Sequence, residues 1–143
     1  MKKLNLALAS ALITAGLATT LSAVSVEESV KLNEKDVCNV EKLGIDKVLA
    51  NAKEYNEVAK KENVEFRRLG VNNTDLIASV EAAIASGAKD VNPVDFKGQP
   101  SKTKLATDYA AWRACAFGLS ALQYKQEAKS TWRDAVPGDG FKY

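Results

Sequence analysis

The amino-acid sequence predicts an all-α fold: a small helical bundle of three to four helices, joined by one disulfide bond between Cys38 and Cys115. Three observations lead to this prediction. Apolar residues recur at helical spacing over several long stretches, whereas alternating runs of β-branched and aromatic residues are absent. The chain also begins with a segment typical of exported proteins, in which an even number of cysteines normally pair.

The N-terminal segment has the layout of a secretory signal peptide. Lys2 and Lys3 form a basic start, an uncharged and mostly apolar run extends over residues 4–21, and small residues follow it. We expect residues 1–23 to be the signal peptide, with cleavage after Ala23 or Ser25. A membrane anchor is the alternative because the run is long enough to span a bilayer, but its many Ala, Ser and Thr residues favour cleavage. The prediction is a periplasmic or secreted protein.

Residues 24–143 have the size of a single domain with its own hydrophobic core. Removing Lys2 and Lys3 from the 20 basic residues of the chain leaves 18, which balances the 18 acidic residues. We therefore expect no nucleic-acid partner, because phosphate neutralisation supplies most of that affinity. No basic face is concentrated enough to hold anionic lipid, and no integral membrane span is expected after cleavage.

Both cysteines follow the signal peptide, and their spacing excludes a CxxC redox motif. Cys115 lies close to an arginine in the stretch YAAWRACAFGLSAL, so a reactive thiol is the alternative to a disulfide bond. A Cys38–Cys115 bond would close a loop of 77 residues, which the chain-entropy description values at about 4.5 kcal/mol. That energy is comparable with the net stability of a small domain.

The first long helix is predicted over the stretch from residue 45 to residue 70. Apolar residues recur there at steps of three and four, and charged residues fall mostly on the opposite face. Asp46 suits the first turn, Arg67 and Arg68 suit the last turn, and Gly70 is expected to end the helix. The residues predicted to be buried are Ile45, Val48, Leu49, Ala52, Tyr55, Val58 and Ala59.

A second helix is predicted within VNNTDLIASVEAAIASGAK, residues 71–89. Asn73 or Thr74 is expected to cap it, and Gly87 is expected to close it. Its predicted buried residues are Leu76, Ile77, Val80, Ala83 and Ile84. Residues 89–102 contain two prolines and a glycine, so we expect an ordered connecting loop there.

The longest helix is predicted from about Lys102 to Ala135, with Ser101 or Thr103 as its cap. One row along this helix is mostly large and apolar: Leu105, Tyr109, Trp112, Ala116 and Leu119. A neighbouring row contains only very small residues: Ala106, Ala110, Ala114 and Gly118. Such a row leaves a shallow groove in which another helix can approach closely.

The sequence offers little catalytic chemistry. It has no histidine, which removes the commonest general base and the commonest transition-metal ligand. Phosphate-loop, haem-attachment and EF-hand motifs are also absent. Carboxylates pair at Glu62 and Glu65 and at Glu54 and Glu57, but at helical spacing beside lysines they are typical of a solvated surface. We expect a protein that is not an enzyme and has no cofactor or metal ion.

The candidate contact residues are aromatic or cationic. Trp112 is expected mainly in the core, and Arg113 is expected to pair with Asp108 or a carboxylate of the first helix, with an anionic ligand as the alternative. The aromatic C-terminal tail either caps the bundle or forms an exposed patch for a partner. The possible partner or ligand contacts are Trp112, Arg113, Trp132, Phe141 and Tyr143.

The resulting hypothesis is an exported, non-enzymatic helical protein that binds another envelope or extracellular protein, as an interaction, accessory or chaperone-like protein. The alternative is a small-molecule-binding protein with an aromatic pocket between helices, lined by Tyr109, Trp112, Phe117 and Arg113. The sequence leaves the oligomeric state and the identity of the partner open.

Overall fold

The computed structural model describes residues 24–131, which form six helices and four very short strands. Three helices are long: α4 (Ile45–Lys61), α5 (Asn73–Ser86) and α6 (Thr107–Thr131). Three helices of one turn precede them: α1 (Val26–Ser29), α2 (Glu34–Val37) and α3 (Val40–Leu43). The predominantly helical class is therefore confirmed. The expected signal peptide and the tail residues Trp132, Phe141 and Tyr143 lie outside the described residues.

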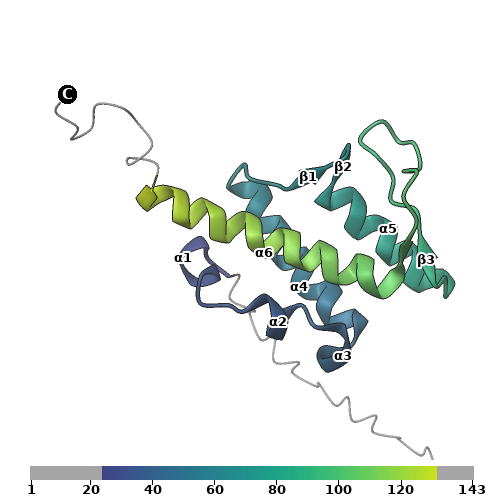
Figure 1. The fold of residues 1–143 in the computed structure, drawn as a ribbon, viewed down its shortest axis with the longest axis horizontal. Helices are drawn as coiled ribbons and strands as arrows, with labels where there is room; N and C mark the ends of the chain where they lie inside the picture. The colour runs from purple at the N-terminus through teal and green to yellow at the C-terminus, as the bar shows by residue number, and fades with distance from the viewer. Residues whose placement is uncertain (1–23, 132–143) are drawn as a thin grey trace, which may run out of the picture.

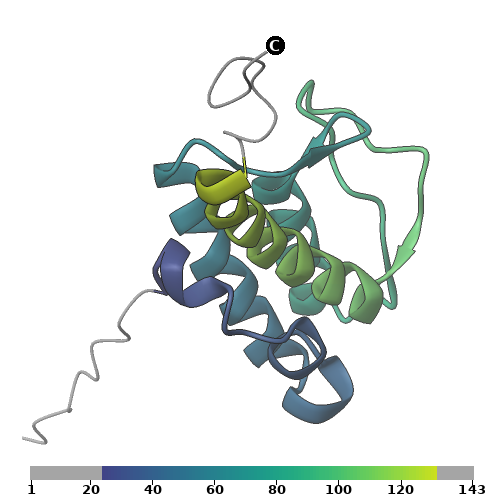
Figure 2. The same cartoon turned by 60° about the vertical axis from the view of Figure 1, so that its left-hand side comes forward.

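Helix α6 is the central element of the molecule (Figure 1). It packs against α4 in the most extensive helix pair and also contacts α5. The short helices α1–α3 form an N-terminal segment that runs along another side of α6 and reaches α4 (Figure 2). The expected bundle of three to four helices is thus replaced by three long helices, a segment of single helical turns and two small sheets.

The close contact between α6 and α4 depends on small residues. Ala110 and Ala114 are fully buried, and Gly118 is buried against α4, where an added Cβ atom would lie 3.0 Å from the Cβ of Tyr55. Gly118 therefore has the role expected of the predicted small row, and Ala110 and Ala114 of the same row are buried as well. The fourth, Ala106, is exposed and precedes the helix.

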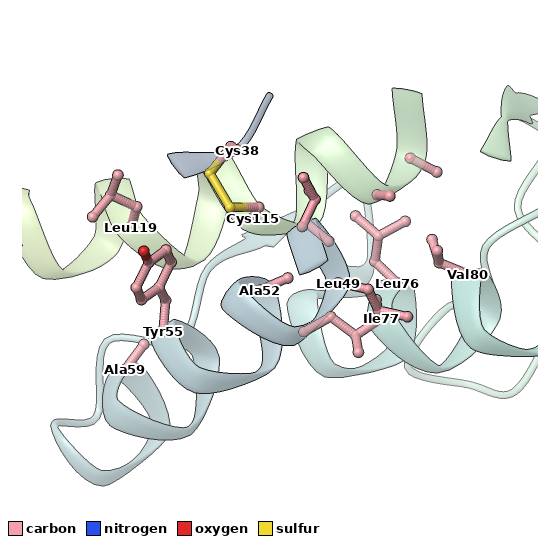
Figure 3. Close-up of a cluster of buried hydrophobic side chains, with 14 of the residues drawn as sticks. Cys38, Leu49, Ala52, Tyr55, Ala59, Leu76, Ile77, Val80, Cys115 and Leu119 are labelled. Atoms are coloured by element: carbon pink, nitrogen blue, oxygen red, sulfur yellow. A yellow bond between two sulfur atoms is a disulfide. The ribbon is translucent and has the colours of Figure 1, made fainter. Parts of the chain in front are cut away.

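The hydrophobic core lies between the three long helices (Figure 3). Tyr55 of α4 points toward Leu119 of α6, and Leu49 lies near Leu76 and Ile77 of α5. Burial of a large apolar side chain contributes about 1.5–3 kcal/mol, so this cluster is the main source of stability. The fully or almost fully buried apolar residues of α4 and α5 are Val48, Leu49, Ala52, Tyr55, Ala59, Leu76, Ile77, Val80 and Ala83, as predicted. Ile45, Val58 and Ile84, which were also expected to be buried, are only partly buried.

Helix α4 ends at Lys61, which is earlier than expected. Asn63 adopts the left-handed conformation with φ of 58°, and the Val64 N–H donates to the Ala59 carbonyl at 2.8 Å. This is the hydrogen-bonding pattern of a Schellman motif, and asparagine tolerates the left-handed conformation better than most residues. The prediction that Gly70 ends this helix is therefore wrong.

Two antiparallel two-stranded sheets, which the all-α prediction did not include, accompany the helices. Strand β1 (Arg67–Arg68) pairs with β2 (Val71–Asn72), and β3 (Asp90–Val91) pairs with β4 (Leu105–Ala106). Each strand has two residues, which is too short to produce an alternating pattern in a sequence. Leu69 and Gly70, with φ of 52° and 82°, form the two-residue turn between β1 and β2.

Strand β4 occupies residues where the longest helix was expected to begin. Helix α6 starts at Thr107, whose N–H donates to the Lys89 carbonyl and whose hydroxyl donates to the Ala88 carbonyl. The predicted caps, Ser101 and Thr103, are therefore wrong, because both lie in the connecting loop. The helix start is instead fixed by the sheet that joins the end of α5 to α6.

The loop between β3 and β4 folds back onto the β1–β2 turn. The Asp95 carboxylate accepts hydrogen bonds from the N–H groups of Lys97 and Gln99, both at 2.8 Å, and the Phe96 N–H donates to the Gly70 carbonyl at 2.8 Å. These contacts confirm the ordered loop predicted there. They also close one side of a cavity against α5 and α6, which is described below.

Candidate functional site

The Cys38–Cys115 disulfide bond joins the N-terminal segment to α6, as predicted (Figure 3). Both cysteines are fully buried, and their Cα atoms lie 5.6 Å apart. Cys38 directly follows α2, so the bond holds the α2–α3 segment beside the first half of α6. Two candidate binding sites lie on different sides of this helix.

The first site is an open groove between the α2–α3 segment and the first turns of α6, with a volume of about 720 Å³. Tyr109 and Trp112 form its aromatic part, with ring centroids 5.2 Å apart. The side chain of Tyr109 is 49% exposed, and Trp112 is half-buried. We call this surface the aromatic groove; its lining residues are Glu34, Lys35, Asn39, Val40, Glu41, Lys42, Asp108, Tyr109 and Trp112.

The position of Tyr109 corrects the predicted packing of α6. The row of large residues was expected to form the core, but only part of it is buried, because Gly118 of the small-residue row brings the backbones of α6 and α4 together. With α6 turned this way about its own axis, the large ring of Tyr109 lies on the flank of the helix, and Trp112 lies half-buried beside it. Of the predicted row, only Ala116 and Leu119 are fully or almost fully buried.

The second site is a smaller cavity of about 60 Å³. It lies between α6, the N-terminus of α5, the β1–β2 hairpin and the loop between β3 and β4. Its walls are mostly apolar, with Leu76, Leu105 and Phe117 among the lining residues. Arg68 and Arg113 also line it, and none of the described lining residues is acidic. We call this site the arginine cavity.

Arg113 is oriented by aromatic contacts rather than by an ion pair. Its guanidinium lies 5.0 Å from the centre of the Phe117 ring, which stacks on Phe66 with a centroid distance of 4.2 Å. Within residues 24–131 it forms no ion pair. The expected pairing with Asp108 or with a carboxylate of the first long helix is therefore wrong, and Asp108 lines the aromatic groove instead.

A buried polar network lies beside the arginine cavity. Asn73, only 1% exposed, donates from Nδ2 to the Asn56 Oδ1 and to the Ala114 carbonyl, both at 3.0 Å. These bonds connect α5 to α4 and α6. The Oδ1 of Asn73 has no hydrogen-bond donor among the described residues, and a buried polar atom in that state costs about 1–3 kcal/mol.

Glu65 caps the N-terminus of α5, a role that the sequence prediction gave to Asn73 or Thr74. Its carboxylate accepts hydrogen bonds from the Thr74 N–H at 2.8 Å, from the Thr74 hydroxyl, and from Asn56 Nδ2 at 3.3 Å. Burial acts to raise the pKa of Glu65, but the hydrogen bonds from Thr74 and Asn56 together outweigh it and lower the pKa. A negative charge here also complements the helix dipole.

The other carboxylates considered in the sequence have structural partners as well. Glu62 forms an ion pair with Lys125 at 2.8 Å, and Glu57 pairs with Lys60 at 3.4 Å. Glu54 accepts a hydrogen bond from the Val24 N–H at 3.0 Å. Among residues 24–131, no cluster of three or more potential metal-ligating side chains occurs. Within the same range, no helix combines the length and apolar character needed to cross a membrane.

The structure separates the residues that were expected to share one aromatic pocket. Tyr109 and Trp112 line the aromatic groove, whereas Arg113 and Phe117 line the arginine cavity. Sequence reasoning missed Asn73 as a buried acceptor, because an asparagine before an apolar run is normally interpreted as a cap. Comparisons with family models, with curated proteins and with solved structures gave no match for this chain.

Proposed function

We propose that this chain is an exported, non-enzymatic protein that binds another envelope or extracellular protein through the aromatic groove. The observation that carries the proposal is the pair of Tyr109 and Trp112 at the surface of that groove. Aromatic side chains are enriched in protein interfaces because they bury a large area with little loss of conformational entropy.

The shape and charge of the groove favour a protein over a small molecule. At about 720 Å³ it is wide and open, whereas small-molecule sites enclose most of their ligand. Its rim carries both signs of charge, at Glu34, Lys35, Glu41 and Lys42. Such a mixed rim gives specificity toward a partner with the complementary pattern.

The location of the protein is part of the proposal. The N-terminal residues have the pattern of a signal peptide, and the disulfide bond of Cys38 and Cys115 is of a kind that persists in oxidising compartments. The same bond fixes one wall of the groove relative to the other. We therefore place the binding activity outside the cytoplasm.

The test uses the oxidised protein, cross-linked in its native envelope, with a Tyr109→Ala variant and a Tyr124→Ala control. Tyr124 lies on the same helix and is 64% exposed, but it does not line the groove. We expect Tyr109→Ala to lose the cross-linked partner and Tyr124→Ala to keep it. The purified partner should then bind Tyr109→Ala more weakly than Tyr124→Ala. Equal capture by both variants would reject the groove as the interface.

A further inference from the structure

The turn between β1 and β2 exposes a large apolar side chain that the fold does not require. Leu69 is 82% exposed, more than any other large hydrophobic residue that the structure describes. It also adopts the left-handed conformation, with φ of 52°, which is unfavourable for leucine and is normally adopted by glycine or asparagine. Neither packing nor backbone geometry therefore accounts for a leucine here, and such a position points to a contact outside the chain.

A second exposed apolar side chain lies beside this turn. Phe96, in the loop between β3 and β4, is 54% exposed, and its N–H donates to the Gly70 carbonyl at 2.8 Å. Its ring packs so near Gly70 that a Cβ atom added to the glycine would lie 3.5 Å from it. Figures 1 and 2 both show the hairpin and the loop together, across α6 from the α1–α3 segment. Leu69 and Phe96 therefore belong to one patch of surface.

Exposed cations surround these two apolar side chains. The Arg67 guanidinium and the Lys97 ammonium lie 5.2 Å and 5.6 Å from the centre of the Phe96 ring, and Arg68 directly precedes the turn. Within residues 24–131, none of the three cations forms an ion pair. The acidic residue of the loop, Asp95, uses its carboxylate to accept two backbone N–H groups of the loop. In the sequence these cations belong to separate segments, which is why no basic face for anionic lipid was expected.

We propose that this surface docks the protein on a lipid bilayer that contains anionic phospholipid. We call it the basic tip; its residues are Arg67, Arg68, Leu69, Phe96 and Lys97. The two apolar side chains enter the boundary between headgroups and acyl chains, and the cations lie at the level of the phosphates. A protein partner would need a closely packed complementary surface, whereas a bilayer needs only apolar tips with cations beside them. In agreement, Phe96 lines neither the aromatic groove nor the arginine cavity.

This inference is independent of the proposed protein partner. The aromatic groove lies between the α2–α3 segment and α6, whereas the hairpin and the loop lie across α6 from that segment (Figures 1 and 2). A protein docked through the basic tip therefore leaves the groove open to the aqueous compartment. Loss of either binding activity leaves the other to be measured.

The test is co-sedimentation of the oxidised protein with vesicles made of equal parts of phosphatidylglycerol and phosphatidylcholine. We expect saturable binding at about 0.1 M salt and a steep loss of binding toward about 1 M salt, because salt screens the cations from the phosphates. Vesicles of phosphatidylcholine alone should bind at least about tenfold more weakly. Absence of binding to the anionic vesicles at about 0.1 M salt would overturn the proposal.

Leu69→Asn removes the apolar side chain and keeps a residue that tolerates the left-handed conformation. It should be at least as stable as the unaltered protein and should bind anionic vesicles about tenfold more weakly or worse. Leu43→Asn makes the same substitution at an exposed position of α3, across α6 from the basic tip, and should change the affinity by less than about twofold. Equal binding of Leu69→Asn and the unaltered protein would reject the insertion of Leu69.

A second pair of variants tests the charge. Lys97→Gln should weaken binding by about fivefold, the usual contribution of one basic residue at an anionic surface. Lys31→Gln removes the same charge from an exposed residue between α1 and α2 and should change the affinity by less than about twofold. Equal effects of the two variants would show attraction by overall charge alone and would overturn the basic tip as the docking surface.

Insertion has its own readout. Tryptophan fluorescence of Phe96→Trp should be quenched by brominated acyl chains in the vesicles, whereas Leu43→Trp should show no quenching beyond that of the unaltered protein. Equal quenching of the two variants would contradict docking through the basic tip. Capture of an envelope protein that Leu69→Asn abolishes, without binding to vesicles, would assign this surface to an acidic protein partner and would overturn the lipid proposal.

Discussion

Gly118 of α6 lies so close to Tyr55 of α4 that a Cβ atom on the glycine would be 3.0 Å from the tyrosine Cβ and 3.3 Å from the Asn56 backbone nitrogen. A backbone atom cannot move aside without displacing α4. This contact limits how α6 can turn relative to α4, and so which of its residues face the groove and which face the cavity. It leads to the first prediction.

Gly118→Ala should destabilise the protein, although alanine is the better helix former. Helix propensity favours alanine by about 1 kcal/mol, whereas overpacking of a tight contact costs about 1–3 kcal/mol. We expect a net loss of about 1 kcal/mol, and a larger loss for Gly118→Val, in chemical denaturation. Ala128→Val adds bulk at an exposed position of the same helix and should cost less than about 0.7 kcal/mol. Greater stability of Gly118→Ala would contradict the close approach.

Removal of the disulfide bond should cost much of the stability. Closing a loop with a separation of 77 residues contributes about 4.5 kcal/mol in the chain-entropy description. We expect the Cys38→Ala/Cys115→Ala variant to unfold at a much lower denaturant concentration than the oxidised protein. The unaltered protein after reduction should behave like this variant. Two free thiols in protein isolated from its native compartment would argue against the proposed location.

Glu65 should make stability depend on acid pH. Its pKa in the folded protein is lower than the ordinary value of 4.5, so this contribution is present above that pH and is lost as the pH falls through the folded value. Glu65→Ala should cost about 1 kcal/mol at neutral pH, the usual effect of losing a helix cap, and should reduce the loss of stability in acid. Glu57→Ala, at an exposed ion pair, is the control and should change stability by less than about 0.5 kcal/mol.

Tyr55 should make stability depend on alkaline pH. Burial, with a smaller effect of Glu54, raises its pKa above the ordinary value of 10.0. The neutral phenol is therefore favoured in the fold, and its contribution is complete below pH 10.0 and is lost as the pH rises through the folded value. Tyr55→Phe should lose less stability in alkali than the unaltered protein. Phenolate absorbance follows the titration, and an unchanged alkaline profile in the variant would contradict it.

The two proposed cleavage sites differ in what they leave of the cap of α1. The Ser25 hydroxyl accepts a hydrogen bond from the Glu28 N–H, and the Glu28 carboxylate accepts one from the Ser25 N–H, which caps α1. Cleavage after Ser25 would remove this cap. Cleavage after Ala23 keeps it and places a new positive amine at Val24, whose nitrogen lies 3.0 Å from the Glu54 carboxylate. Under the proposed export, we expect the sequenced N-terminus to be Val24, and a start at Val26 would refute this.

The parts of the fold that could be predicted are those set by long patterns. The periodicity around Tyr55 marked the buried face of α4, and Gly87 ends α5 with φ of 68°, as expected. The pairing of Cys38 with Cys115 followed from their number and the expected compartment. Each of these features has one dominant physical cause that is local in sequence or needs only one partner.

The parts that could not be predicted depend on contacts between distant residues. Helix α4 ends at Lys61 because Asn63 beyond it adopts the left-handed conformation, whereas the sequence also offers Gly70, which is equally able to end a helix. The exposure of Tyr109 follows from how closely Gly118 approaches α4, which two overlapping apolar rows on α6 do not reveal. The candidate site at Asn73 needs Asn56 and Ala114 beside it, and these come from two other helices.

The long separation of the two cysteines also has a consequence for biogenesis. A ribosome completes Cys38 77 residues before it completes Cys115, so the first cysteine spends most of synthesis without its partner. Any disulfide it makes in that interval joins it to another molecule. The native bond can form only after Cys115, in the first half of α6, has emerged, so oxidation records that synthesis has reached α6.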